Sequence, residues 1–161
     1  MGNKFLKLLV GFSAIVMILT FADVSNAQRR RESRNRMMTK VQVKAVINRV
    51  ENRVDNFVKH YDKSLDNSRL NGTNREDWLN GRAKQLESAT DELSREFQRR
   101  DAWIENKDEV QRCLNIAYDI NKSIVNRRLS RDTENIWAKV RFELNTLADV
   151  YNLPKVGSNA Y

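Results

Sequence analysis

Residues 41–65 read VQVKAVINRVENRVDNFVKHYDKSL, and their apolar positions recur every three or four residues. On an α-helix this spacing gathers the apolar side chains into one stripe about 100° wide, with charged residues on the opposite face. The pattern predicts a long amphipathic helix whose apolar stripe is buried against other elements. The stripe residues are Val43, Val46, Ile47, Val50, Val54, Phe57, Val58, Tyr61 and Leu65.

Three later segments show the same period, from Leu79 to Phe97, from Val110 to Ile124 and from Ile136 to Tyr151. No segment alternates apolar and polar residues with a period of two, so no sheet is expected. Short turns place consecutive helices antiparallel, and four apolar stripes can close one common core. The sequence therefore predicts an all-α, antiparallel four-helix bundle over residues 41–153, followed by a C-terminal tail over residues 154–161.

Turn and capping signals separate these segments. Residues 67–73 supply turn formers, and Thr73 followed by Glu76 reads as a capping box at the start of the second helix. Asn71 is an alternative cap for that helix. Asn106 and Ser130 are the predicted caps of the third and fourth helices, with acidic residues after each.

An internal repeat links the two halves of the bundle. Sliding the sequence by 59 residues matches Trp78 with Trp137, and it also matches Arg53 with Arg112, Arg69-Leu70 with Arg128-Leu129, and Arg82 with Arg141. The match predicts two similar helical hairpins. Chance agreement between amphipathic helices is the alternative. Equivalent positions predict that both tryptophans pack against the other hairpin, with a ligand groove as the alternative.

The turn at residues 67–77, NSRLNGTNRED, and the later turn from Arg128-Leu129 to Trp137 carry a resemblance. Both are similar to turns in a group of exported bacterial all-helical proteins of unassigned function. The resemblance covers most of the chain after residue 27 and rests on turn residues and core spacing. It implies a helical fold and export, and it transfers no functional residue.

The first 27 residues have the pattern of a secretory signal peptide. Lys4 and Lys7 precede an apolar run from Leu8 to Ala22, and Ser25-Asn26-Ala27 supplies small residues before a cleavage site at Gln28. An uncleaved signal anchor is the alternative, although the run is shorter than the roughly 20 residues that span a membrane. We therefore expect a periplasmic or secreted protein.

Most of the net charge of +8 lies in a basic leader, residues 28–40, which holds six basic residues and one acid. Its arginines are candidate contacts with an anionic membrane or cell-wall surface, and a solvated leader is the alternative. The later residues are nearly balanced, so no specific nucleic-acid-binding face is expected. The candidate residues are Arg29, Arg30, Arg31, Arg34 and Arg36.

The sequence predicts no catalytic, cofactor-binding or metal-binding residue. It holds one histidine and one cysteine, whereas the usual transition-metal and haem sites need several converging ligands. His60 is expected beside its apolar stripe, and Cys113 within the core, with an intermolecular disulfide as the alternative. Three acid pairs one helical turn apart are expected to be neutralised by neighbouring bases. They are Glu51 with Asp55, Asp62 with Asp66, and Glu87 with Asp91; the bases are Arg49, Arg53, Lys59, Lys63, Lys84 and Arg95.

The connector between the halves holds an apolar pair, Trp103 and Ile104, that we expect to be exposed and to contact a protein partner. Together these patterns predict a non-enzymatic exported protein, a structural or interaction component of the bacterial cell envelope, as a monomer or homodimer. A periplasmic chaperone or envelope-stress sensor is the alternative.

Overall fold

Four long helices and one short 3-10 helix account for most of the part described by the computed structural model, which is residues 38–127 and 129–157. No residue in these two ranges lies in a strand, so the prediction of an all-α fold is confirmed. The elements are α2 (Lys40–Asp66), α3 (Asn74–Arg99), η1 (Trp103–Asn106), α4 (Lys107–Arg127) and α5 (Arg131–Val150).

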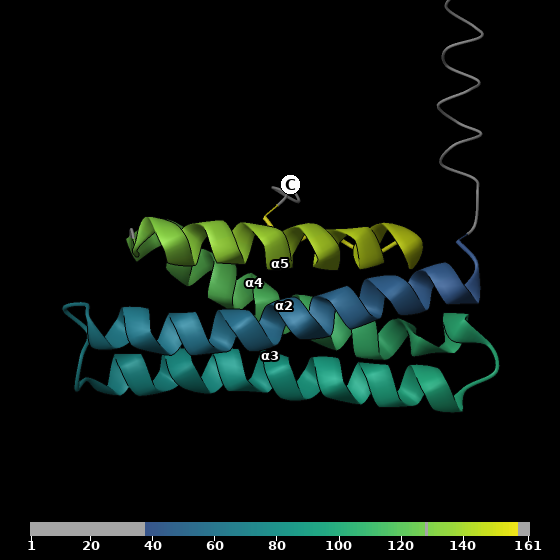
Figure 1. The fold of residues 1–161 in the computed structure, drawn as a ribbon, viewed down its shortest axis with the longest axis horizontal. Coiled ribbons are helices and arrows are strands. Elements are labelled where there is room, and N and C mark those ends of the chain that lie inside the picture. The colour runs from purple at the N-terminus through teal and green to yellow at the C-terminus, as the bar shows by residue number, and fades with distance from the viewer. Residues whose placement is uncertain (1–37, 128, 158–161) are drawn as a thin grey trace, which may run out of the picture. The chain divides into compact units, whose positions relative to one another are not determined.

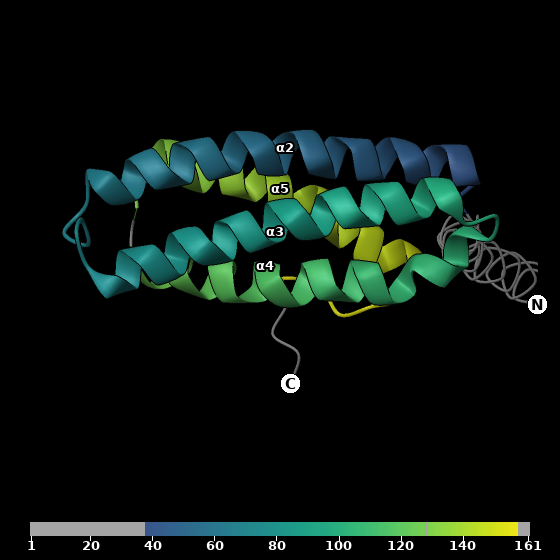
Figure 2. The ribbon, with the colours of Figure 1, turned by 90° about the horizontal axis from the view of Figure 1, so that it is seen from below.

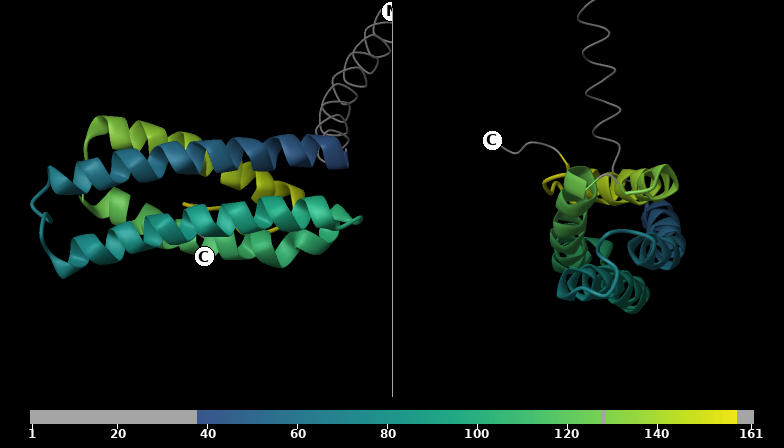
Figure 3. Two further views of the ribbon diagram at one scale, coloured as in Figure 1. Left: turned by 60° about the horizontal axis from the view of Figure 1, so that its bottom comes forward. Right: turned by 90° about the vertical axis from the view of Figure 1, so that its left-hand side faces the viewer.

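The long helices alternate in direction, and each lies beside its neighbours in sequence (Figures 1 and 2). Seen end-on, they occupy the corners of a square, with α2 between α3 and α5 (Figure 3). α2 packs closely on both neighbours, whereas α4 packs on α3 and less closely on α5. The seam between α4 and α5 is therefore the loosest of the four.

The core is built from the apolar stripes that the sequence predicts. Every stripe residue of α2 is buried except Val58, which is partly buried. Full burial of one large aliphatic or aromatic side chain contributes about 1.5–3 kcal/mol, so the shared core is the main source of stability.

Two of the predicted N-caps are confirmed, but the capping box predicted at Thr73 is only half formed, because the Glu76 carboxylate accepts from the Gly72 amide and not from that of Thr73. The hydroxyl of Thr73 accepts a hydrogen bond from the Glu76 amide, and that of Ser130 accepts one from the Thr133 amide. Asn71 does not cap α3, since Thr73 is its N-cap; the Asn71 Nδ2 donates to the Asp66 carbonyl oxygen. Asn106 is buried and donates to the carbonyl of Trp103, so it closes η1 rather than capping α4.

The first helix begins one residue earlier than predicted. Thr39 caps α2 through a reciprocal capping box with Gln42. Lys40, which is predicted to lie in the basic leader, is a helical residue, and its Nζ donates to the carbonyl oxygen of Arg100 at 2.8 Å. The bundle therefore begins at Thr39, two residues before the predicted start.

The predicted C-terminal tail also differs from expectation. α5 ends at Val150, and Asn152 adopts a left-handed φ of 51°. The Leu153 amide donates to the Ala148 carbonyl at 2.8 Å, which closes a Schellman motif and turns the chain back. Residues 153–157, here called the strap, then run back along the bundle, and Val156 is 3% exposed. Part of the predicted tail therefore belongs to the core.

Residues 1–27, where a signal peptide is predicted, lie outside the described residues, as do residues 28–37 of the basic leader. The five candidate arginines are within that leader segment. Among the described helices, none has the length and apolar character needed to cross a bilayer.

Candidate functional site

The single thiol is sealed in the core. Cys113 is buried on α4, as predicted, and burial raises the pKa of its thiol to about 12. A thiol with such a pKa stays protonated at neutral pH and is a poor nucleophile. Because the sulfur is not accessible, an intermolecular disulfide requires the bundle to open.

The single histidine lies on the surface. His60 is exposed, and its Nδ1 is 2.8 Å from the carbonyl oxygen of Asn56, one helical turn earlier. A carbonyl oxygen only accepts, so Nδ1 carries the proton and donates to it. The remaining ring nitrogen, Nε2, is the one available to a ligand.

The acid pairs do not have the ion-pair partners that the sequence suggested. No ion pair joins any of the six acids to another described residue. Two of the expected partners, Arg49 and Arg53, instead bind Glu143 of α5, with each nitrogen 3.1 Å from its Oε1. In the described ranges, no group of three or more potential metal ligands converges.

Glu143 fastens α5 to α2. Its side chain is almost fully buried, and only one of its two carboxylate oxygens is paired. Arg53 also donates through Nη1 to the carbonyl oxygen of Lys139 at 3.1 Å. A buried carboxylate needs such charged partners to offset its desolvation, so this contact fixes how the two helices sit together.

A groove lies at the end of the bundle, between the α2–α3 turn and the α4–α5 turn. We call it the turn-end groove, and its volume is about 1310 Å³. One helix cap contributes to it, because Ser130, the N-cap of α5, is a lining residue. The described lining residues are His60, Lys63, Ser64, Asn67, Ser68, Arg69, Leu70, Leu129, Ser130, Asp132 and Thr133.

The chemistry of the turn-end groove favours an anionic or polyhydroxylated ligand. Lys63 and Arg69 carry its positive charge, and neither forms an ion pair with a residue that the structure describes. Among its described lining residues, Asp132 is the one acid. The hydroxyls of Ser68 and Ser130 already bond the backbone of their own turns, while Leu70 and Leu129 pack against the core. The groove can therefore bind by charge and hydrogen bonding.

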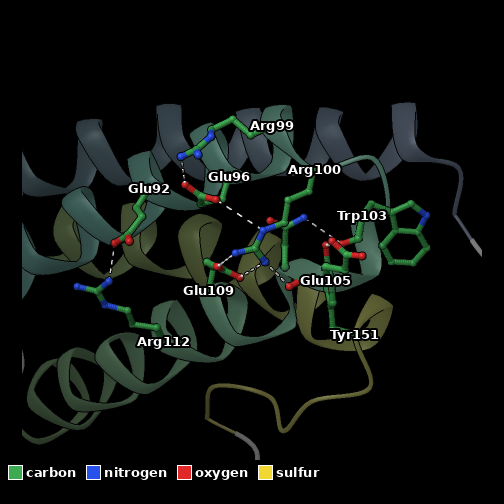
Figure 4. A network of polar contacts seen from close by, with 10 residues as sticks. Glu92, Glu96, Arg99, Arg100, Trp103, Glu105, Glu109, Arg112 and Tyr151 are labelled. Carbon is green, nitrogen blue, oxygen red and sulfur yellow. Dashed lines mark hydrogen bonds and ion pairs between the residues drawn. The ribbon is translucent and has the colours of Figure 1, made fainter.

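The opposite end of the bundle is held by a polar network (Figure 4). Arg100 contacts the Glu105 carbonyl and both carboxylate oxygens of Glu109, with Nη2 2.6 Å from Oε1. The hydroxyl of Tyr151 donates to the carbonyl oxygen of Trp103 at 2.9 Å, and the two rings meet edge to face. Burial, together with the charge of Glu109, raises the pKa of Tyr151 to about 12.

Trp103 and Ile104, both predicted to be exposed partner contacts, differ in their exposure. Trp103 is partly buried and packs against the core. Ile104 is exposed. Of the pair, Ile104 therefore offers the free apolar surface, and Trp103 mainly holds the connector against α5.

The predicted equivalence of the two tryptophans is wrong. Trp137 is 2% exposed, packs on Phe57 of the first hairpin, and donates from Nε1 to Asn121 Oδ1 at 3.0 Å. Trp78 is 43% exposed and lies beneath the guanidinium of Arg75, 4.5 Å from its ring centre. Only the second tryptophan is a core anchor.

No family model matches this chain, and neither a curated protein nor a solved structure is significantly similar to it. Functional inference therefore rests on its own residues.

Three features of the structure were not predicted from the sequence: the contact of Glu143 with α2, the turn-end groove and the packing of the strap on the bundle. For the first there was a signal, since Glu143 lies one residue before Leu144 on the apolar side of its helix.

Proposed function

We propose that this chain is an exported, non-enzymatic helical bundle that serves as a structural or interaction protein of the bacterial cell envelope. The observation that carries the proposal is the turn-end groove, whose cations Lys63 and Arg69 form no ion pair with a described residue and suit reversible binding of an anion. The chain's only thiol is protonated and buried, and its only imidazole donates to its own backbone. The signal-like pattern of residues 1–27 supplies the expected location.

The proposed partner surface is anionic, either a membrane or a cell-wall polymer. The arginines of residues 28–37 and the two cations of the turn-end groove provide two sets of positive charge for it. Each basic residue close to an anionic membrane contributes about 1 kcal/mol, and salt screens that attraction. Binding is therefore expected to be strong at low ionic strength and weak at high ionic strength.

The test is cosedimentation of residues 28–161 with phosphatidylglycerol vesicles at low and high salt, with phosphatidylcholine vesicles as a control. A variant lacking residues 28–37 keeps the Thr39 cap, and so leaves α2 intact. Its affinity should fall by at least about tenfold, given roughly 1 kcal/mol per basic residue. Equal binding with and without these residues would refute the proposed anionic contact through the leader.

The contribution of the groove is measured separately. Replacing both Lys63 and Arg69 by Ala should weaken binding, because they line the turn-end groove. Replacing Lys44 and Lys84 by Ala removes the same charge from exposed helical positions outside the groove and is the matched control. Equal losses in both double variants would remove the groove from the proposal and leave general charge as the cause.

A periplasmic chaperone or envelope-stress sensor is the second candidate. The observation in its favour is that the fold holds the backbone of the strap at Val156 through the side chain of Asn145. Suppression of the aggregation of an unfolded client by the purified protein would support this candidate, and unchanged aggregation would count against it.

A further inference from the structure

One face of α2 is open toward the turn-end groove. His60, Lys63 and Ser64 line the groove, and their spacing of three and one residues places them on the same side of the helix. With the residues that the structure describes, Lys63 forms no ion pair and the Ser64 hydroxyl forms no hydrogen bond. These two groups are therefore available to a ligand.

The groove keeps opposite charges apart. Lys63 of α2, Arg69 of the α2–α3 turn and Asp132 of α5 all line it. Asp132 pairs with neither cation, and within the described ranges none of the three forms an ion pair with another residue. Because these charges do not neutralise one another, the groove offers both an anion-binding pair of cations and an acidic acceptor.

His60 adds a second acceptor. Its Nδ1 donates to the Asn56 carbonyl oxygen, 2.8 Å away, so the lone pair of the neutral ring is on Nε2. Such a lone pair accepts a hydrogen bond from a hydroxyl group and has no proton to give to an oxyanion. His60 and Asp132 therefore suit a ligand that brings hydrogen-bond donors as well as negative charge.

We propose that the turn-end groove binds a phosphodiester that ends in glycerol, the group shared by a phosphatidylglycerol headgroup and the free end of a glycerol-phosphate polymer. Lys63 and Arg69 pair with the phosphate, since ammonium and guanidinium groups are common partners of phosphate oxygens. The glycerol hydroxyls donate to His60 Nε2 and to the Asp132 carboxylate. The inference rests on the proposed function, because it names the group that the groove recognises in an anionic partner.

The two acceptors set the selectivity of the groove. A phosphodiester without hydroxyls, such as dimethyl phosphate, pairs with the two cations but donates nothing to His60 or Asp132. Each hydrogen bond that the ligand does not form should lower its affinity about two- to tenfold. The charge of Asp132 also repels a plain anion, whereas a glycerol hydroxyl turns the same carboxylate into a favourable contact.

The only histidine of the chain serves as the reporter. When histidine is isotopically labelled in residues 28–161, the imidazole C–H signals in NMR spectra arise from His60 alone. Titration with glycerophosphoglycerol, the soluble headgroup of phosphatidylglycerol, should shift these signals to saturation at low salt. Dimethyl phosphate should bind more weakly by the factor given above, and glycerol alone should not saturate the groove.

The cations are tested with two matched double variants. Lys63→Ala/Arg69→Ala should weaken binding of glycerophosphoglycerol at least about tenfold, because both charged partners of the phosphate are lost. Lys44→Ala/Lys84→Ala removes the same charge from exposed positions outside the described lining and should bind as the wild type does. Circular dichroism checks that both proteins are folded.

The acid gives the sharper test. Asp132→Ala should weaken binding of glycerophosphoglycerol about two- to tenfold and strengthen that of dimethyl phosphate, because it removes an acceptor and a repelling charge together. Glu134→Ala removes an exposed acid from the same first turn of α5, outside the described lining. This control should affect the two ligands alike.

Three results would overturn the proposal. The first is the absence of a saturable shift of the His60 signals. The second is equal affinity for the phosphodiesters with and without glycerol. The third is tighter binding of glycerophosphoethanolamine, which would assign Asp132 to an ammonium group instead of a hydroxyl.

Vesicles distinguish the two sources of the glycerol group. Release of the chain from phosphatidylglycerol vesicles by excess glycerophosphoglycerol would support the lipid headgroup. A His60 shift with a soluble glycerol-phosphate oligomer, in a chain that does not sediment with vesicles, would support the polymer. A chain that sediments with vesicles but shows no His60 shift would refute this inference and leave the proposed anionic contact through the leader intact.

Discussion

α3 and α5 both begin at a hydroxyl N-cap, yet positions that match in the 59-residue repeat are buried in α3 and exposed in α5. Sliding the sequence by 59 residues superimposes Leu79 on Ala138 and Ala83 on Phe142. The two α3 residues are buried, whereas Ala138 is exposed and Phe142 is 67% exposed. The gapless match therefore aligns core positions of one helix with surface positions of the other.

The helix caps explain this difference. Trp78 is five residues after its cap, Thr73, and Trp137 is seven residues after its cap, Ser130. Two residues turn an α-helix by about 200°, so the same residue type points to another face. α2 and α4 behave otherwise, because Val54 and Cys113 match in the same alignment and both are fully buried. The repeat is thus maintained in the first helices of the hairpins and lost in the second.

The largest expected effect is at the two tryptophans. Trp137→Ala should destabilise the bundle by about 3–5 kcal/mol, because it empties a core site and leaves Asn121 with one donor fewer. Trp78→Ala should cost less than about 1 kcal/mol, mainly the lost contact with Arg75. Urea denaturation followed by far-UV circular dichroism measures both. Equal losses would restore the equivalence that the sequence match predicts.

The next effect comes from exchanging residues at the mismatched pair of positions. Ala83→Phe should cost about 1–3 kcal/mol or more, because the core has no room for a ring. Phe142→Ala should change stability by less than about 0.5 kcal/mol, as for other surface sites. Thermal unfolding of the two variants gives the comparison. A harmless Ala83→Phe would mean that α3 does not bury the face described.

The helix caps should respond alike in both hairpins. Thr73→Ala and Ser130→Ala each remove a hydroxyl that accepts from an amide of the first helical turn. Each change should cost about 1 kcal/mol, the usual value for an N-cap. The same urea titrations measure it, with Thr73→Ser as a conservative control. If either variant were as stable as the wild type, that residue would not be the N-cap, and the caps would not explain why Trp78 and Trp137 point to different faces.

The smallest effect is expected where the repeat is maintained. Cys113→Val reproduces the residue found at the matched position in α2 and should cost less than about 1.5 kcal/mol. The wild-type thiol should react with a disulfide reagent at pH 8 only after unfolding, as a colorimetric assay in and out of urea measures. Rapid reaction of the folded protein would show that the core opens at α4.

The same thiol fixes a direction of pH dependence. Its pKa rises from 9.0 to about 12 on folding, so the folded state favours the protonated form. The resulting stabilisation is complete below about pH 9 and is lost as pH rises toward 12. Comparing wild type with Cys113→Val across that interval isolates this contribution from the other groups that titrate there.

Much of the fold follows from local patterns. The four apolar stripes and the caps Thr73 and Ser130 are all encoded within a few residues, where helical period and capping chemistry decide the outcome. The start of α2 was also encoded, in Thr39 and Gln42, but these residues lie at the end of a basic run that hides the signal.

The remaining features depend on contacts between distant residues. The partners of Glu143 lie 90 or more positions away, so the sequence gives no reason to prefer them to the acids one turn from each arginine. The turn-end groove joins two turns about 60 residues apart. Docking of Val156 depends on a loose α4–α5 seam, which helical periodicity does not encode.

The most direct test of an exported binding module is the intact mass of the protein recovered from the periplasmic or secreted fraction of a bacterial host. We predict a single species that begins at Gln28 and lacks residues 1–27, because small residues precede that position. A full-length protein confined to the cytosolic fraction would contradict export, and with it the proposed role in the cell envelope.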